Sequence, residues 1–492
     1  MKRRAPKEII YLESDQPRVR RLLEQVDERL DLPKKQRLLM RQDYLGALRC
    51  FFISGVPIEE ALRRLDPAQL GDFYRAERTD WYPLDHAAKV YPLSMSLNRM
   101  MVFRLSGYLA EDVQPVLLQI ALHHVVTRFP YFATTIKCGF FWHYLDGTKR
   151  RYRVRPETKL PCAVMRVNAY NSPSFRVVYF KNRVSVEFFH ILTDGTGGMI
   201  FLKTLLAEYL RLLTGENIPA EEGVFALADP PQPAEWADDF LLGDKASVTN
   251  GFTDQRAIQL SGALPFETPN RVLHLHMSVG ALKARAHALG GSVSALVLGY
   301  LFLACKEAIP AHTGRKKIQI QLPVNMRKFY PSGTLRNFSM YCSIRLKPSE
   351  ATALENIVPL IDAQIREGAS KEKLDQTMAV TRRLVKALRF VPLIIKRPIA
   401  YVLFGALGDG VFTTTLSNLG AVTLPEAMRP YVRKFDFVLG PPTLNRAAFS
   451  LCSYGDTAVL TITKNTQSEA VENALYRLLC EDGLAPYVEG SR

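Results

Sequence analysis

The feature that most constrains this chain is a strand that runs into a glycine-rich turn and then into a helix. Val184 to Phe189 is rich in β-branched and aromatic residues, which is typical of a buried strand. The nine residues that follow, from His190 to Gly198, read HILTDGTGG. Met199 to Leu213 then places apolar residues at three-to-four spacing, which predicts a helix. The sequence therefore predicts a strand, a tight turn and a helix, with one histidine and one aspartate in the turn.

Two interpretations of this turn follow from its residue types. A neutral imidazole accepts a proton near pH 7, so His190 at the end of a buried strand suits a general base. Asp194 can instead fold back and hold the turn, and Gly195 lets backbone approach backbone closely. On spacing alone, a structural turn and a catalytic base both stay open.

The chain divides into four segments by pattern. Residues 1–80 are charge-rich and helical in periodicity, and we expect an N-terminal helical extension. Residues 81–215 and 269–492 each mix strand and helix patterns, which predicts an α/β fold of two similar halves. Residues 216–268 are rich in Pro, Gly, Ala and Asp. Because proline lacks the backbone donor, we expect a linker or crossover there.

Periodicity places individual elements within these segments. Helices are expected in the extension at 18–30, 35–52 and 58–65. The first half is expected to hold strands at 99–105, 132–136, 140–145, 175–179 and 184–189, and helices at 113–128 and 199–213. The second half is expected to hold strands at 272–277, 317–322, 338–346, 410–416, 435–439, 448–453 and 458–463, and helices at 279–289, 293–308, 353–366, 374–390 and 469–480.

Composition narrows the partners and the compartment. The chain carries 64 Lys and Arg against 48 Asp and Glu, and this net charge of +16 favours a polyanionic partner. No nucleic-acid-binding motif is recognisable, so we expect no nucleic acid. Seven cysteines without a CxxC spacing indicate reduced thiols in a cytoplasmic protein. His274 and His276 lack a third ligand at a supporting spacing, so no metal is expected.

His190 to Gly195 resembles the HxxxDG signature of the chloramphenicol acetyltransferase-like superfamily of CoA-dependent acyltransferases. Further segments resemble the same group, in the same order along the chain: Leu84 to Pro92, Leu322 to Tyr330 with Arg336 to Ser339, and Thr415 to Gly420, which contains SNLG. Together they cover about residues 81–480. The chain is most similar in these segments to bacterial alcohol acetyltransferases and condensation-domain-like proteins.

The resemblance implies a fold and a reaction. The fold would be two pseudo-symmetric α/β sandwich halves with a central tunnel between them. An acyl group, with acetyl as one option, would pass from CoA, or from a phosphopantetheine arm on an acidic carrier protein, to a hydroxyl or amine. His190 would deprotonate the acceptor, and no covalent acyl-enzyme would form. No metal is implied.

The resemblance also implies roles for residues outside the turn. Asp194 would be structural, and Ser339 is our candidate donor to the oxyanion. Ala133 stands where condensation domains carry the arginine that pairs with this aspartate, so we expect Arg327 to pair with Asp194 instead. Phe189 replaces the first of two adjacent histidines, which argues against a peptide-synthetase condensation domain. The residues expected to line the tunnel are Ser417, Asn418, Asn337 and Tyr341.

Two alternatives remain beside a soluble acyltransferase. One is a non-catalytic binding or assembly protein on the same fold. The other is a lipid acyltransferase at a membrane surface, because residues 378–405 interleave Lys and Arg with large apolar residues. Such a segment can bind an anionic membrane peripherally, contact a carrier protein or cofactor phosphates, or form a core-facing helix with a solvated basic face.

Overall fold

The computed structural model describes residues 16–75, 80–89, 91–93, 101–165, 173–243, 255–263, 271–311, 314–399, 409–441 and 445–491. Within these residues the chain is a mixed α/β protein with sheets of seven, five and three strands. Two large hydrophobic cores form, one around the five-stranded sheet and one around the seven-stranded sheet. The α/β fold expected from the sequence is therefore confirmed.

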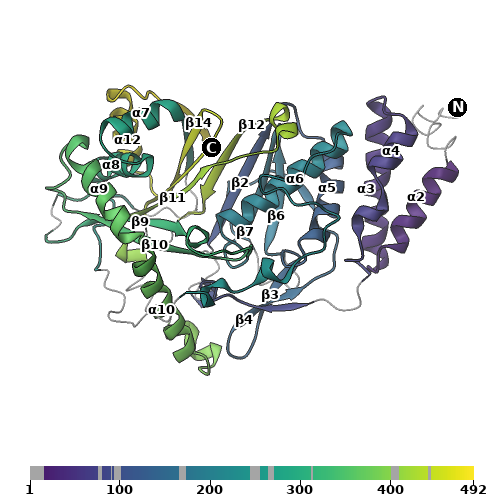
Figure 1. The fold of residues 1–492 in the computed structure, drawn as a ribbon, viewed down its shortest axis with the longest axis horizontal. Helices are drawn as coiled ribbons and strands as arrows, with labels where there is room; N and C mark the ends of the chain where they lie inside the picture. Colours follow the sequence, from purple (N-terminus) through teal and green to yellow (C-terminus); the bar gives the residue numbers. More distant parts are fainter. Residues whose placement is uncertain are drawn as a thin grey trace.

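Three helices form the N-terminal extension: α2 (Gln16–Glu28), α3 (Lys34–Ile53) and α4 (Ile58–Arg64). They lie at one end of the molecule, beside α5 (Pro115–Arg128) (Figure 1). Pro33 and Pro57 immediately precede α3 and α4. A proline suits the start of a helix because its missing N–H would find no partner there in any case. Asp43 of α3 joins the extension to α5 through His123, at 2.8 Å between Oδ2 and Nε2.

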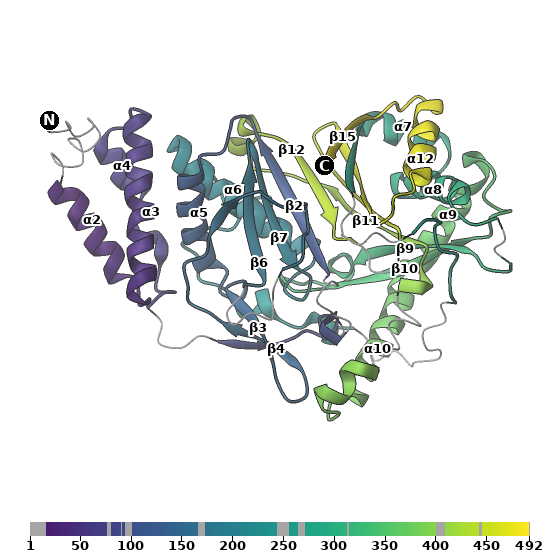
Figure 2. The same cartoon turned by 180° about the vertical axis from the view of Figure 1, so that it is seen from behind.

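The first half is built on a five-stranded sheet covered on one face by α5 and by α6 (Gly195–Thr214) (Figures 1 and 2). The strand order is β12-β2-β7-β6-β5. Its members are β2 (Val102–Leu109), β5 (Val154–Pro156), β6 (Phe175–Phe180), β7 (Arg183–Phe189) and β12 (Val432–Leu439). A small sheet of β1 (Trp81–Pro83), β4 (His143–Gly147) and β3 (Thr134–Cys138) lies below it in Figure 1.

The second half is built on a seven-stranded sheet in the order β10-β9-β11-β13-β14-β8-β15. Its strands are β8 (Arg271–Ser278), β9 (Ile318–Asn325), β10 (Ser339–Leu346), β11 (Thr414–Ala421), β13 (Ala447–Tyr454), β14 (Thr457–Lys464) and β15 (Tyr487–Ser491). Its helices are α7 (Val279–Ala288), α8 (Val293–Glu307), α9 (Leu354–Gly368), α10 (Lys371–Ala387) and α12 (Ala470–Glu481).

Strand β12 links the two halves. It belongs to the segment 269–492, yet it pairs antiparallel with β2 of the first sheet, with Phe437 opposite Leu105. Both of these side chains are buried in the core around the five-stranded sheet. Because this edge strand comes from the far end of the chain, the first sheet is complete only when the second half is in place.

Most expected elements are present with shifted ends. Strands β2 and β11 lie several residues later than expected, because Ser106 and Gly107 continue β2 through the middle of the sheet and Ser417 to Ala421 continue β11 beside β13. Strand β4 starts at His143 rather than Phe140, because Phe140 and Phe141 form the hairpin tip. Strands β1, β5 and β15 were not expected.

Among the described residues, no single helix has the length and apolar content needed to cross a membrane, whereas the bent pair α7 and α8, at 83° to one another, passes that test by length and composition alone.

Candidate active site

His190 directly follows strand β7, at the edge of the first half. The strand runs between β2 and β6 in the sheet, and all but its first residue are buried. Directly after it, the His190 backbone N–H donates to the carbonyl of Met101 at 2.7 Å. Helix α6 then starts at Gly195, with Asp194 as its N-cap. The expected order of strand, turn and helix is therefore present.

Both carboxylate oxygens of Asp194 are occupied by structural partners. Oδ1 accepts from the backbone N–H groups of Thr196 and Gly197, each at 3.1 Å, which caps α6. Oδ2 accepts from Arg327 Nη1 at 2.7 Å and from the Phe338 backbone N–H at 2.9 Å. The partner expected from the sequence, Arg327, is thus brought to Asp194. This ion pair joins the turn of the first half to the segment between β9 and β10.

The glycines of the turn allow this close approach. A Cβ atom on Gly197 would lie 2.2 Å from the Leu335 carbonyl oxygen, which is a backbone atom and cannot move aside freely. On Gly195 it would lie 2.4 Å from Cδ2 of Leu419, next to the end of β11. A larger residue at position 197 would therefore push the two halves apart at the turn.

The His190 ring lies at the end of a hydrogen-bonded chain of three side chains. Its Nδ1 is 2.9 Å from Oδ1 of Asn337, and Nδ2 of Asn337 donates to Oδ2 of Asp85 at 3.2 Å. An ionised carboxylate only accepts, so Asn337 turns its NH₂ toward Asp85 and its oxygen toward His190. The network therefore assigns the proton of the neutral ring to Nδ1. Nε2 keeps its lone pair.

Burial sets the charge state of this chain of side chains. The His190 ring lies 5.2 Å from the Tyr91 ring and 5.1 Å from the Phe103 ring, between centroids, and the residue is half-buried. Burial lowers the pKa of His190 below its ordinary value, because the imidazolium loses hydration. Asp85 is fully buried, and burial, reinforced by the charge of Asp238, raises its pKa to about 6. At pH 7 His190 is neutral and Asp85 is ionised, as the assigned hydrogen bonds require.

Of the other residues predicted for the site, one contacts His190 and the rest lie on strands β10 and β11. Asn337 was expected to line a tunnel, and the structure places it against His190. Asn418 lies near the end of β11, where its oxygen accepts from the Gly420 N–H at 2.8 Å and its NH₂ donates to Ser294. Ser417 is half-buried on β11, and Ser339 and Tyr341 lie on β10, with Tyr341 packed on Phe412. Within the described residues, no hydrogen bond joins Ser339, Ser417 or Tyr341 to His190, and their roles stay predictions.

Asp85 is the site residue that the sequence analysis missed. It lies in the segment Leu84 to Pro92 that carried part of the resemblance, but nothing local marks its carboxylate as buried. Its partner Asn337 is 252 residues away along the chain. Within the described residues, no group of three or more His, Cys, Asp or Glu side chains is arranged to hold a metal ion.

Several solved structures share this fold. No protein-family model matches the chain, and no curated protein matches it. The trichothecene 15-O-acetyltransferase TRI3 of Fusarium sporotrichioides superposes with a TM-score of 0.54 at 14% identity, over 82% of this chain and 94% of that one. Polyketide synthase associated protein 5 of Mycobacterium tuberculosis gives 0.55 at 14% identity, over 81% and 96%.

A third structure contains a bound coenzyme. Fusarium graminearum TRI101, complexed with coenzyme A and deoxynivalenol, superposes with a TM-score of 0.55 at 11% identity, over 84% of this chain and 99% of that one. Condensation and epimerization domains of peptide synthetases match as well. The chain therefore has the fold of the chloramphenicol acetyltransferase-like acyltransferases, as the sequence motifs indicated.

Proposed function

We propose that this protein is an acyltransferase that moves an acyl group from a CoA or carrier-protein thioester to a hydroxyl or amine. The observation that carries the proposal is the hydrogen-bonded chain from Asp85 through Asn337 to His190, which leaves Nε2 of a neutral imidazole as a proton acceptor. The shared fold with acetyltransferases, one of which was solved with coenzyme A, supports it. The net charge of +16 suits the phosphates of such a donor.

The reaction then needs one base and one oxyanion donor. Nε2 of His190 takes the proton of the acceptor, whose oxygen or nitrogen attacks the thioester carbonyl. The tetrahedral intermediate collapses and expels the thiolate, which recovers the proton from the imidazolium. Transfer is direct, without a covalent acyl-enzyme. Ser339 remains our candidate donor to the oxyanion, and we place Ser417, Asn418 and Tyr341 along the tunnel in which donor and acceptor meet.

The direct test is thiol release. Purified protein is mixed with acyl-CoA donors of several chain lengths and with panels of alcohols, amines and lipids. We expect free CoA and an acylated acceptor of the matching mass to appear in equal amounts. Saturable binding of CoA without thiol release over the whole panel would favour the alternative of a non-catalytic binding protein.

The pH dependence of the reaction follows from the two buried groups. Burial disfavours charge, so it raises the pKa of Asp85 to about 6 and lowers the pKa of His190. The active combination, ionised Asp85 with neutral His190, is present above about pH 6 and is lost as pH falls. We expect kcat/KM to rise through about pH 6, where Asp85 ionises, and then to level off. A rise in kcat/KM centred above pH 7, about one unit higher than the pKa of Asp85, would contradict this assignment.

A specific surface favours contact with a membrane during this reaction. Among the large apolar side chains most open to solvent are Ile394 at 82%, Phe140 at 72% and Phe390 at 69% exposed. They belong to two segments, the tip of the β3–β4 hairpin and the chain that follows α10, which lie together at the bottom of Figures 1 and 2. The rings of Phe141 and Phe390 are 6.1 Å apart, and Leu393 N–H donates to the Phe140 carbonyl at 2.9 Å.

The charges along the segment after the middle of α10 all have one sign. Residues 376–399 contain no acid, and their basic residues are Arg382, Arg383, Lys386, Arg389, Lys396 and Arg397. Lys396 bridges the two segments, because its Nζ donates to the Phe141 carbonyl at 2.8 Å. We propose a cytoplasmic protein that docks peripherally on anionic lipid through this surface. Residues 400–405 of the stretch expected from the sequence lie outside the described residues.

Vesicle binding tests this docking surface. We expect the protein to sediment with vesicles containing anionic lipid, less so at high salt, and the variant Phe390→Ser/Ile394→Ser to partition about tenfold less. Ile53→Ser, which changes a side chain 67% exposed on the extension, is the matched control and should bind like wild type. Equal binding to neutral vesicles, or binding unchanged in the double variant, would contradict the proposal. If the double variant binds vesicles like wild type but loses binding to an acidic carrier protein, the surface belongs to the carrier protein and the membrane proposal is wrong.

A further inference from the structure

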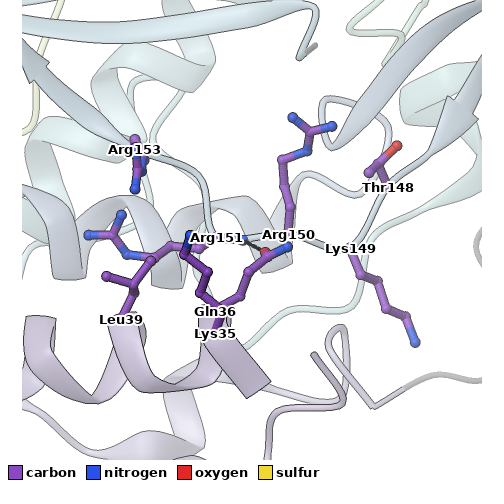
Figure 3. Close-up of a pocket in the computed structure, with 8 residues that line it drawn as sticks. All are labelled: Lys35, Gln36, Leu39, Thr148, Lys149, Arg150, Arg151 and Arg153. Carbon is purple, nitrogen blue, oxygen red and sulfur yellow. Dashed lines mark hydrogen bonds between the residues drawn. The ribbon is translucent and has the colours of Figure 1, made fainter. Parts of the chain in front are cut away.

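A cavity of about 360 Å³ lies between the helical extension and the first half, in a part of the fold that the acyl-transfer proposal does not use. One wall is the start of α3, and the other is the segment 148–153 between β4 and β5 (Figure 3). The Gln36 side chain joins the walls by accepting from the Arg151 backbone N–H at 2.8 Å. The cavity is lined by Lys35, Gln36, Leu39, Thr148, Lys149, Arg150, Arg151 and Arg153.

The charge of this lining is entirely positive. Five of its eight residues are Lys or Arg, and none is Asp or Glu. Arg151 is neutralised by a two-bond ion pair with Asp43, at 2.5 and 2.6 Å. Lys35, Lys149, Arg150 and Arg153 form no ion pair within the described part of the chain. The lining therefore presents four uncompensated cations from two walls.

Arg150 shows the clearest need for a ligand. Its Nε and Nη2 are buried and have no hydrogen-bond partner within the described residues. Burial also lowers the pKa of this guanidinium, because its charge is poorly hydrated. A buried cationic donor without an acceptor is costly, and phosphate oxygens are the acceptors that a guanidinium fork fits best.

The start of α3 adds to the same field. Its N-cap is Pro33, which makes no side-chain capping bond, and its first turn holds Lys34 and Lys35 with no acid. The N-terminal end of a helix dipole is positive, so two lysines there are unfavourable unless an anion is bound.

We propose that this cavity binds a compact polyphosphate, a ligand with several linked phosphate groups and no aromatic base. The lining offers one apolar residue, Leu39, and no aromatic ring on which a base could stack. Cations on two walls match several separated negative charges better than one phosphate ion. The volume is at the lower end of the range for small-molecule sites, about 300–1,000 Å³. The bound anion ties the extension to the first half, and this gives the extension a role.

Calorimetric titration of the full chain with inorganic tripolyphosphate tests the site. We expect saturable binding and a raised melting temperature, since a ligand of the folded state stabilises it. Arg150→Gln/Arg153→Gln should bind at least about tenfold more weakly. Arg315→Gln/Lys316→Gln removes the same charge at exposed positions in the other half and should bind like wild type. The single variant Lys149→Gln gives a smaller loss if the double variant fails to fold.

Two further arms separate the sources of such a ligand. Orthophosphate at equal ionic strength should bind far more weakly. Vesicles that carry a multiply phosphorylated headgroup, compared with the soluble ion, decide whether the phosphates are free or lipid-borne. His190→Ala should bind tripolyphosphate like wild type, so the test of this site is independent of the proposed reaction. Absence of tripolyphosphate binding, or equal losses in both charge-matched double variants, would overturn the proposal.

Discussion

Replacement of His190 by Ala is expected to lower turnover by about 10²–10⁴-fold, the contribution of a positioned base to proton transfer. The acceptor would then have to lose its proton to water during the attack on the thioester. The fold should survive, because His190 is only half-buried and, within the described residues, its side chain forms one hydrogen bond, to Asn337. The measurement is kcat with the donor and acceptor found in the thiol-release screen.

The matched comparison for this variant is a change at the aspartate of the same turn. Asp194→Asn removes a structural carboxylate that holds Arg327 and caps α6, so it should lower the melting temperature as well as turnover. His190→Ala should lower turnover alone. If His190→Ala retains wild-type kcat while the donor is consumed, His190 is not the base and the proposed mechanism is wrong.

The sequence was most informative where the chemistry is local. The turn from His190 to Gly198 lies on one short segment, so its strand, N-cap and helix were predictable from β-propensity, an Asp before a glycine and apolar spacing. The fold class followed for the same reason, since strand and helix patterns repeat in both halves. The partner Arg327 could be proposed because one expected arginine was missing and another lay in a resembling segment.

The sequence was least informative where contacts join distant segments. Asp85 meets Asn337 across 252 residues, and β12 enters the first sheet from the far end of the chain. Neither contact leaves a periodic signal, because periodicity reports which face of an element is buried and not what covers it. The polar residues of β2 show the same limit: Arg104 and Ser106 are buried by partners on other strands, and their polarity obscured the extent of the strand.

The tautomer of His190 depends on the charge of Asp85, and this predicts a second large effect. In Asp85→Asn, the new side chain must keep its oxygen toward the Ala88 N–H, which now donates to Asp85 at 2.6 Å. Its NH₂ then faces Asn337, which must turn its oxygen toward position 85 and its NH₂ toward Nδ1 of His190. Nδ1 becomes an acceptor, the proton moves to Nε2, and the base is lost. We expect kcat to fall by about 10²–10⁴-fold, as when a catalytic histidine elsewhere is held in the wrong tautomer.

At pH 7 the free energy of unfolding of Asp85→Asn should rise, although its turnover falls. This difference separates a positioning role of Asp85 from a structural one. Because the folded protein raises the pKa of Asp85 to about 6, ionisation of that carboxyl costs roughly 3 kcal/mol of folding free energy at pH 7. In the wild type the protonated carboxyl of Asp85 favours folding at pH values below its unfolded pKa. This stabilisation is lost as the pH rises through about 6, where the carboxyl ionises in the folded protein. Asp85→Asn removes the titration, so its free energy of unfolding should fall less with pH over this range, while turnover is low at every pH. Asp238→Asn, which changes a nearby carboxylate bonded to His86 and not to Asn337, should leave the tautomer of His190 intact. Long-range ¹H–¹⁵N correlations of the His190 ring report the tautomer directly: a proton on Nδ1 in both Asp85→Asn and wild type would refute this coupling.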